Sequence, residues 1–338
     1  MVSRHCWLVC LSLVLAATML VATTGQAQAD AHEDKASDQA KRVVFVAGSR
    51  SHGYGEHSHR AGCMLLADLL QKHHPDIKTK VYTGGWPSDA KAFKGADSIV
   101  MYNDGGGGHM VLNHLKQVDK LADKGVGIVA LHYGVEVPKG KAGDHFLKWI
   151  GGYFETHYSL NPYWTAKYKN LPDHPITRGV PPFSQYDEWY YHMRFKPNMP
   201  NTTPILSDLP PKETLLGRGW SPGESSKAHH GNQHAYDAVV KEKKPQHTAW
   251  AKVRPDGGRG FGCTGGHYHW GWAQDDFRTL VLNAIAWTAH AEVPESGLRT
   301  PTPSAERMME NLDYDKPGNV TAKKIQKKIR KMNRDKLN

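Results

Sequence analysis

Four short apolar runs restrict the fold of this chain more than any other feature. They occupy residues 43–47, 98–102, 126–131 and 260–264, and each is followed by glycine together with a polar or ionisable residue. Short apolar runs that alternate with helical patterns are typical of buried parallel strands. We therefore predict an α/β protein whose mostly parallel sheet is covered by helices on both faces.

The remaining periodic segments fit the same architecture. Apolar residues at helical spacing predict helices over 61–73, 111–124 and 277–289, and alternating residues predict strands over 78–83, 185–195, 203–206 and 248–253. The last of these strands should form a hairpin with the run at 260–264, since a Pro-Asp-Gly-Gly turn joins them. The polar stretch 220–246, with His229, His230 and His234, is expected to be a surface insertion.

The loops after the predicted strands carry side chains suited to chemistry. Right-handed crossovers place the carboxyl ends of parallel strands along one edge of a sheet. His52, Asp104, His109 and His132 follow the runs at 43–47, 98–102 and 126–131. We expect these four side chains to face one crevice.

The run at 260–264 leads into the most distinctive motif of the chain. Gly265 and Gly266 allow a sharp backbone turn, and His267 and His269 follow at once among Tyr268, Trp270 and Trp272. A strand, a glycine turn and a helix N-terminus present reactive groups at the edge of a sheet. The alternative is that these histidines only stack on neighbouring aromatic rings at the surface.

The N-terminus has the pattern of a secretory signal peptide. Arg4 and His5 precede an apolar run at 6–23, and Ala-Gln-Ala at 27–29 fits a cleavage site. We predict a signal peptide at 1–29 and a polar leader at 30–41, with an uncleaved anchor as the alternative. No later stretch is long and apolar enough to cross a bilayer, so we expect a soluble protein exported to the periplasm or the exterior.

Only two cysteines remain once the leader is removed, Cys63 and Cys263. Two cysteines do not make a disulfide scaffold, and a chain of this length can bury a core without one. A single bridge between them stays open. A two-thiolate zinc site is disfavoured because the sequence has no Cys-x-x-Cys pair.

The formal net charge of +10 is concentrated at the C-terminus. From Lys316 onward there are nine Lys or Arg residues and one acid, whereas residues 30–315 contain 33 basic and 32 acidic residues. Residues 321–337 place Ile325, Ile329 and Met332 on one side of a lysine-rich helix. We predict a body at 42–293, a linker at 294–320 and a basic amphipathic tail at 321–338. The tail is expected to be a solvated appendage that could touch a membrane surface, nucleic acid or an acidic partner.

Several motifs, taken in order, resemble the trehalose-utilisation (ThuA-like) family. They are Gly-Ile-Val-Ala-Leu-His-Tyr-Gly at 127–134, Ile-Gly-Gly at 150–152 with His157, His-Pro-Ile-Thr at 174–177, Asp-Glu-Trp-Tyr at 187–190 and the segment 258–267. This resemblance implies a flavodoxin-like, class I glutamine amidotransferase-like fold, a three-layer α/β sandwich. It places His132 at the strand-to-helix elbow where amidotransferases carry a cysteine nucleophile, and His267 near their catalytic histidine. Glutamine hydrolysis by a thiolate is therefore disfavoured.

Imidazoles and a carboxylate gathered in one crevice form a ligand set for a divalent metal such as zinc, iron, nickel or manganese. We predict His52, His132, Glu188 and His267 as the ligands, with His57, His109 and His269 in reserve. Glu188 or a spare histidine would move the proton, so that Glu188, His132 and His267 are the predicted catalytic residues. Two alternatives stay open: metal-free acid and base catalysis on a sugar, and a purely structural hydrogen-bond network.

The resemblance implies a small carbohydrate as substrate, and no nucleotide cofactor is expected. Asp104 and Asp187 are predicted to accept sugar hydroxyls, and aromatic or imidazole rings to stack on the sugar or bind it. These rings are those of Tyr190, His269 and Trp270, with Tyr153, Tyr158, Trp164, Trp189, Tyr268 and Trp272 as further candidates. Two classes of function remain: an exported carbohydrate enzyme, and a non-catalytic sugar-binding or scaffold protein that docks through its basic tail. No specific binding of nucleic acid is expected.

Overall fold

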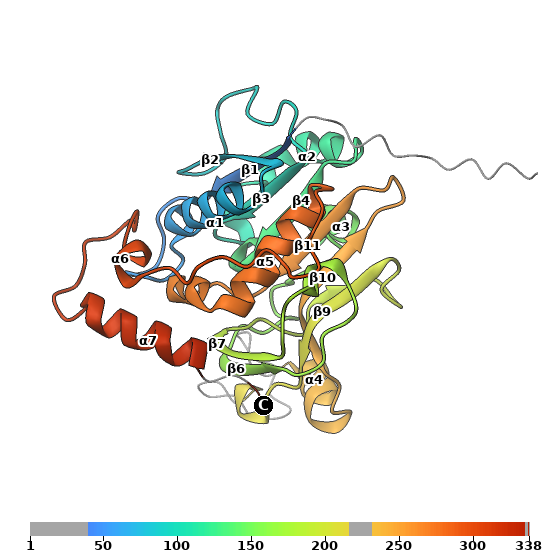
Figure 1. Ribbon diagram of the computed structural model, residues 1–338. Helices are drawn as coiled ribbons and strands as arrows, with labels where there is room; N and C mark the ends of the chain where they lie inside the picture. The colour runs from blue at the N-terminus through green and yellow to red at the C-terminus, as the bar shows by residue number, and fades with distance from the viewer. Residues whose placement is uncertain (1–39, 216–231, 335–336, 338) are drawn as a thin grey trace, which may run out of the picture. The chain divides into compact units, whose positions relative to one another are not determined.

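A seven-stranded sheet forms the centre of the computed structural model, which describes residues 40–215, 232–334 and 337 (Figure 1). Its order is β2 (Ile77–Tyr82), β1 (Lys41–Ala47), β3 (Ser98–Tyr102), β4 (Gly127–Leu131), β11 (Arg259–Cys263), β10 (Gln246–Val253) and β9 (Thr202–Asp208). The first five strands are parallel, and β10 and β9 are antiparallel to their neighbours. The predicted α/β architecture with a mostly parallel sheet is confirmed, as is the hairpin of β10 and β11.

Helices cover both faces of the sheet, which makes three layers. Successive side chains of β1 point to opposite faces, so Val43 and Phe45 join one apolar cluster and Val44 and Val46 join the other. The helices α1 (His59–His73) and α5 (Asp275–Thr288) pack into the first cluster, and α2 (Leu115–Ala122) and α3 (Lys141–Trp149) into the second (Figure 1). The parallel strands are therefore buried on both sides, as their continuous apolar sequence requires.

Two segments before β4 depart from a simple alternation of strand and α-helix. A succession of turns connects β2 to β3, because the glycines and the proline at 84–87 interrupt any helical pattern. Residues 111–124 begin with a 3₁₀ turn, Leu112–His114, before α2 starts. Neither difference moves the carboxyl ends of the strands.

A second hairpin lies beside the main sheet. Strand β6 (Tyr163–Tyr168) pairs antiparallel with β7 (Phe183–Glu188), and two short strands, β5 (Gly152–Tyr153) and β8 (Arg194–Phe195), pair with each other. The predicted strand 185–195 therefore ends at Glu188. Its alternation fails there because Trp189, Tyr190 and Tyr191 are all buried in succession.

The insertion at 220–246 is only partly described. Its described part holds α4 (Gln233–Tyr236) and a π-helical turn, Asp237–Lys241, in which His234 is exposed. His229 and His230 lie outside the described residues, as does the predicted signal peptide at 1–29. No helix in the described ranges is long and apolar enough to span a membrane.

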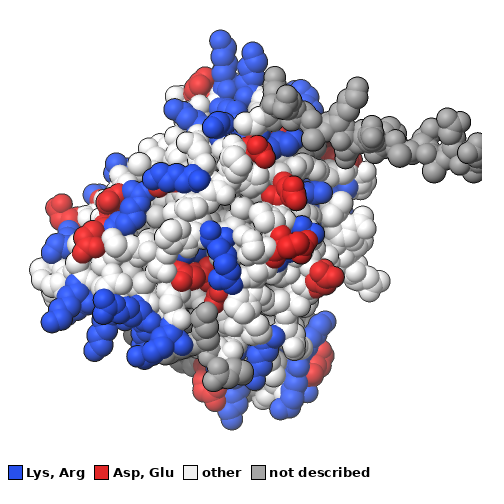
Figure 2. All heavy atoms as spheres, viewed as in Figure 1, with Lys and Arg blue, Asp and Glu red and all other residues white. Residues whose placement is uncertain are grey.

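The C-terminal region packs on the body. Leu298, Ala305 and Met308 are buried, the last two in α6 (Ala305–Met308), so the predicted linker is part of the core. Helix α7 (Ala322–Arg334) buries Ile325 and Ile329 in the same cluster as α1 and α5. The predicted apolar side of the tail is thus correct, but it covers the body and leaves the lysine-rich side to solvent (Figure 2).

The docking of α7 should contribute measurably to stability. Ile329 is 1% exposed, so Ile329→Ala should lower the free energy of unfolding by about 2 to 4 kcal/mol, as is usual for a cavity in a packed core. The exposed neighbour Lys327 supplies the control, since Lys327→Ala should change it by less than about 0.5 kcal/mol. Urea unfolding of both variants checks this, and equal values for the two would contradict the packing.

Candidate metal centre at the carboxyl edge of the sheet

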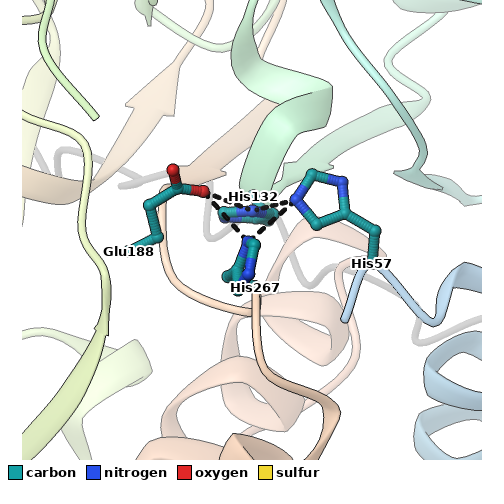
Figure 3. Close-up of side chains that lie close together, drawn as sticks. All are labelled: His57, His132, Glu188 and His267. Carbon is teal, nitrogen blue, oxygen red and sulfur yellow. Dashed lines mark hydrogen bonds and ion pairs between the residues drawn. The ribbon is translucent and has the colours of Figure 1, made fainter. Parts of the chain in front are cut away.

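Four side chains from distant parts of the chain meet at the carboxyl edge of the sheet (Figure 3). His57 lies in the loop after β1, His132 directly follows β4, Glu188 ends β7 and His267 follows β11. The Nε2 atom of His57 lies 3.0 Å from Nε2 of His132 and 2.9 Å from Nδ1 of His267. The Oε2 atom of Glu188 lies 3.0 Å from His267 Nδ1 and 3.5 Å from His132 Nε2. We call these four residues the histidine–glutamate cluster.

The backbone at two of these histidines is strained. His57 has φ = 39° and His132 has φ = 51°, in the left-handed region that favours glycine. Such conformations cost on the order of 1 to 3 kcal/mol and persist where the surrounding structure holds them. At His132 the strained residue makes the sharp turn from β4 into a short 3₁₀ helix, which aims the imidazole over the end of the sheet.

Hydrogen bonds fix the tautomers of His57 and His132. Nδ1 of His132 lies 2.8 Å from the carbonyl oxygen of Thr264, which can only accept, so this nitrogen carries the proton. Nδ1 of His57 lies 2.9 Å from a carboxylate oxygen of Asp104 and donates in the same way. In the neutral rings both Nε2 atoms therefore present lone pairs to the centre of the cluster.

Asp187 holds the loop that carries His267. Its side chain is fully buried and accepts hydrogen bonds from the backbone amides of Gly266 at 2.9 Å and His267 at 3.1 Å, with that of Tyr268 at 3.4 Å. Gly266 has φ = 117°, and a β-carbon there would lie 2.8 Å from the ring of Trp272. The glycine turn expected from the sequence is thus required, and a buried carboxylate caps it.

The described residues bring two tyrosine hydroxyls to the cluster. The hydroxyl of Tyr190 lies 3.3 Å from His132 Nε2 and 3.4 Å from a carboxylate oxygen of Glu188. The hydroxyl of Tyr163 lies 3.2 Å from Nε2 of His267, the nitrogen that faces away from the centre. Tyr190 is buried, whereas 45% of Tyr163 is exposed, so Tyr163 marks the side on which solvent approaches.

Comparison with known proteins identifies the family. A family model described as trehalose utilisation (ThuA) matches residues 42–288. The chain belongs to the ThuA family. All four residues of the histidine–glutamate cluster lie within the ThuA match, so the site is part of the family domain.

Solved structures of ThuA-like proteins are also similar to this chain. One, from Bacteroides uniformis, is 18% identical over 74% of this chain and 91% of its own, with a TM-score of 0.48. Another, from Parabacteroides merdae, is 14% identical over 76% of this chain and 92% of its own, also with a TM-score of 0.48. No curated protein matches the sequence.

Burial and close contacts shift the pKa values of two residues in the ThuA site, His57 and Glu188. Burial, opposed by the hydrogen bond to Asp104 and aided by the neighbouring imidazoles, lowers the pKa of His57 to about 3. Burial alone would raise the pKa of Glu188, but its contacts with His132 and His267 lower it to about 2. At neutral pH His57 is therefore neutral and Glu188 carries a negative charge.

Glu136 is a second acid at this edge, placed just after the 3₁₀ helix that His132 begins. It is buried and accepts a hydrogen bond of 2.9 Å from Thr156. Burial and the nearby charge of Glu188 raise the pKa of Glu136 to about 7, against the effect of Thr156. Glu136 therefore exchanges its proton near neutral pH, where a proton-carrying group is most useful.

The raised pKa of Glu136 predicts a pH dependence of stability. An acid whose pKa is about 7 when folded and about 4.5 when unfolded stabilises the fold fully below pH 4.5 and loses this contribution as the pH rises through 7. In metal-free protein, the free energy of unfolding of wild type relative to Glu136→Gln should fall by about 2 to 3 kcal/mol between pH 4.5 and 8. Denaturant unfolding of both proteins over this range measures the difference, and a constant difference would contradict the burial of the carboxyl.

Three of the four predicted metal ligands belong to the histidine–glutamate cluster, and one does not. His132, Glu188 and His267 converge, but His52 does not join them, and His57, a reserve, takes its place. The His52 side chain is 40% exposed and its ring stacks on His57 at 3.6 Å between centroids. His52, His57 and Asp104 form a second group of close donors. Because His57 Nδ1 carries its proton toward Asp104, this group orients His57 and is not a second ligand set.

The other reserve histidines lie elsewhere. His109 is buried, with Nε2 at 3.1 Å from the carbonyl oxygen of Gly134 and Nδ1 accepting from the amide of Val111. His269 is also buried, and hydrogen bonds to the backbone of Met308. Both rings are therefore held by backbone groups away from the cluster.

The predicted substrate-binding residues are divided in the same way. Asp104 and Tyr190 lie at the cluster, but Asp187 is fully buried and its oxygens are taken up by amides, so it cannot accept sugar hydroxyls. Trp270 belongs to the apolar core, as do Trp164, Trp189 and Trp272 among the further candidates. The sequence reasoning missed Tyr163 and Tyr186, whose exposure follows from the alternation of β6 and β7.

Cys63 and Cys263 are both free and buried. Burial raises the pKa of Cys263 to about 12 and that of Cys63 still higher. Neither thiol can supply a thiolate near neutral pH, which agrees with the predicted absence of a thiol mechanism.

Proposed function

We propose that this protein is an exported, metal-assisted enzyme of carbohydrate metabolism that carries out acid/base or hydrolytic chemistry on a sugar or keto-sugar. The observation that supports it best is the convergence of His57, His132, His267 and Glu188 on one point. Membership of a family described as trehalose utilisation supports the carbohydrate class. The signal-peptide pattern at 1–29 supports export.

The chemistry of the four donors favours a bound cation. Two neutral imidazoles that present lone pairs to each other at 3.0 Å repel unless a positive charge lies between them. Four of the six donor separations are 2.9 to 3.5 Å and all are within 4.8 Å, close to the spacing of about 3.3 Å expected around a tetrahedral zinc with bonds of about 2.0 to 2.1 Å. Three nitrogens and one carboxylate oxygen suit zinc, and also iron, nickel or manganese.

The hydrogen-bond partners of the three histidines are arranged as they are in metal sites. Asp104 and the carbonyl of Thr264 each hold the outer nitrogen of one ligating histidine, and such partners fix ring orientation and ligand basicity. Tyr163 does the same for His267 from the solvent side. A metal bound here would polarise a carbonyl group or activate water.

The residues of the chain supply the remaining functions of such a site. Glu188 is ionised and can serve as a ligand or accept a proton from the substrate. Glu136 can return a proton near neutral pH, and the hydroxyl of Tyr190 can donate to a developing negative charge. The buried walls made by Tyr190 and His132 restrict water on the inner side.

Turnover by metal-free and reloaded protein tests the proposal. Protein without a histidine tag is treated with chelator, reloaded with Zn²⁺, Fe²⁺, Ni²⁺ or Mn²⁺, and assayed on trehalose, maltose and their keto derivatives. We expect turnover only after reloading, and a fall in kcat of about 10² to 10⁴ in Glu188→Gln. His145→Ala is the control, because His145 lies on α3 and contacts Asp119.

Two outcomes would contradict the proposal. Turnover that is equal with and without metal would favour metal-free acid and base catalysis. Tight sugar binding without metal and without turnover would favour the non-catalytic binding protein.

A further inference from the structure

We infer that the exposed rings of Tyr163 and Tyr186 and the half-buried ring of Tyr268, together with Lys328 of α7, form a subsite for the second ring of a neutral disaccharide. The inference rests on the proposed function, because the subsite borders the histidine–glutamate cluster. It makes the C-terminal helix a part of the substrate site. We call the three rings the tyrosine platform.

Strand pairing places the platform in register with the cluster. In the hairpin of β6 and β7, Tyr163 lies opposite Glu188 and Thr165 lies opposite Tyr186. Residues two apart share a face, so Tyr163, Tyr186 and Glu188 point to the same side. The opposite face, with Trp164 and Asp187, is buried.

The rings form a continuous path away from the cluster. The ring of Tyr163 lies 5.1 Å from that of His267 and 5.9 Å from that of Tyr268, and Tyr186 stacks on Tyr268 at 6.1 Å with an interplanar angle of 19°. Tyr163 and Tyr186 are 45% and 54% exposed. They are two of the four large hydrophobic side chains exposed among the described residues, so they are a local exception to burial.

Charged groups of both signs border the platform. Nζ of Lys328 lies 4.9 Å above the ring of Tyr268, and no acidic side chain in the described ranges forms an ion pair with it. Glu56 pairs through its backbone with Tyr268, and its carboxylate lies 3.9 Å from Nε2 of His267. An acceptor and a donor beside aromatic faces match the hydroxyls and the apolar face of a neutral pyranose.

The docking of α7 fixes the position of Lys328. Ile325 and Ile329 flank it in the sequence and are buried, and Asn333 donates to the carbonyl of Ala273 and accepts from the amide of Asp275. The helix therefore cannot rotate without losing these contacts. Lys331, one turn further along, is exposed and has no ring contact among the described residues.

Binding of trehalose and maltose to four variants tests the subsite by calorimetry. Tyr186→Ala should weaken the binding of at least one of them about tenfold or more, and Lys328→Ala about threefold to tenfold. Tyr186→Phe keeps the ring and should bind within about twofold of wild type. Lys331→Ala removes the same charge from the same helix and should also leave binding unchanged.

The metal content of each variant separates this inference from the proposed function. Tyr186→Ala and Lys328→Ala should hold as much metal as wild type. If sugar binding is insensitive to both variants, or if wild type binds neither sugar, the subsite is overturned whatever the metal content. If wild type holds no metal but Tyr186→Ala weakens sugar binding, the subsite stands and the metal-assisted function fails. Equal effects of Lys328→Ala and Lys331→Ala would show that only net charge matters and would remove Lys328 from the subsite.

Discussion

His132→Ala should lose metal affinity by more than about 100-fold while the protein remains folded. Its Nε2 lies at the centre of the cluster, 3.0 Å from His57 and 3.5 Å from Glu188, and no other described side chain is placed to replace it. Alanine keeps a β-carbon at φ = 51°, so the backbone strain at this position stays and the surrounding structure must still hold the turn. Competition with a chromophoric chelator measures the affinity, and circular dichroism measures the folding.

Two further variants should lose less metal affinity than His132→Ala. Asp104→Asn keeps the shape beside His57 but weakens the hold on its Nδ1 proton, so affinity should fall by about 10- to 100-fold. His145→Ala removes a histidine of α3 that contacts Asp119 and is not in the cluster, so it should leave affinity at the wild-type value. A loss in His145→Ala as large as in His132→Ala would mean that the metal binds elsewhere.

Asp187→Ala should give the largest loss of stability, about 3 to 5 kcal/mol. The carboxylate is fully buried and accepts from the amides of Gly266 and His267, which would be left unpaired in a dry environment. The same loop carries His267, so metal affinity should fall together with stability. Asp187→Asn retains one acceptor oxygen and should lose roughly half as much.

Urea unfolding of the metal-free variants measures this effect. Asp123→Ala is a suitable control, because 55% of that side chain is exposed and its pair with Lys148 lies at the surface. It should change the free energy of unfolding by less than about 1 kcal/mol. A loss below 1 kcal/mol in Asp187→Ala would show that the loop 265–268 does not depend on the carboxylate.

The sheet and its reactive edge follow from the sequence because they rest on strong local rules. Apolar runs ending in glycine predicted β1, β3, β4 and β11, and the geometry of parallel strands then placed His132 and His267 at one edge. His132 directly follows β4, and His267 follows β11 after a short glycine turn. Their positions therefore depend on little beyond the strands themselves.

The positions of the strands do not determine whether His52 or His57 joins the cluster. Both lie in a loop of eleven residues between β1 and α1, and both have a positive φ that non-glycine residues rarely adopt, so their local backbone does not distinguish them. The pairing of residues 55–57 with 267–269 holds His57 in place, and it involves backbone groups about 210 positions apart. Sequence patterns carry no signal for such a contact.

Strand alternation in the sequence already indicated that Asp187 and Glu188 could not both face the site. Neighbouring residues of a strand face opposite sides, so only one of the two carboxylates could point into the crevice. His269 and Trp270 were misplaced for another reason. The chain forms a 3₁₀ helix at His269–Ala273, which directs these side chains into the core.

The most direct test of the central claim is a crystal structure of tag-free protein with anomalous diffraction data collected at the absorption edges of zinc, iron, nickel and manganese. We predict one metal ion per chain, bound by Nε2 of His57, Nε2 of His132, Nδ1 of His267 and a carboxylate oxygen of Glu188. An ordered, correctly folded protein with no anomalous peak between these side chains, even after soaking with each metal, would contradict it.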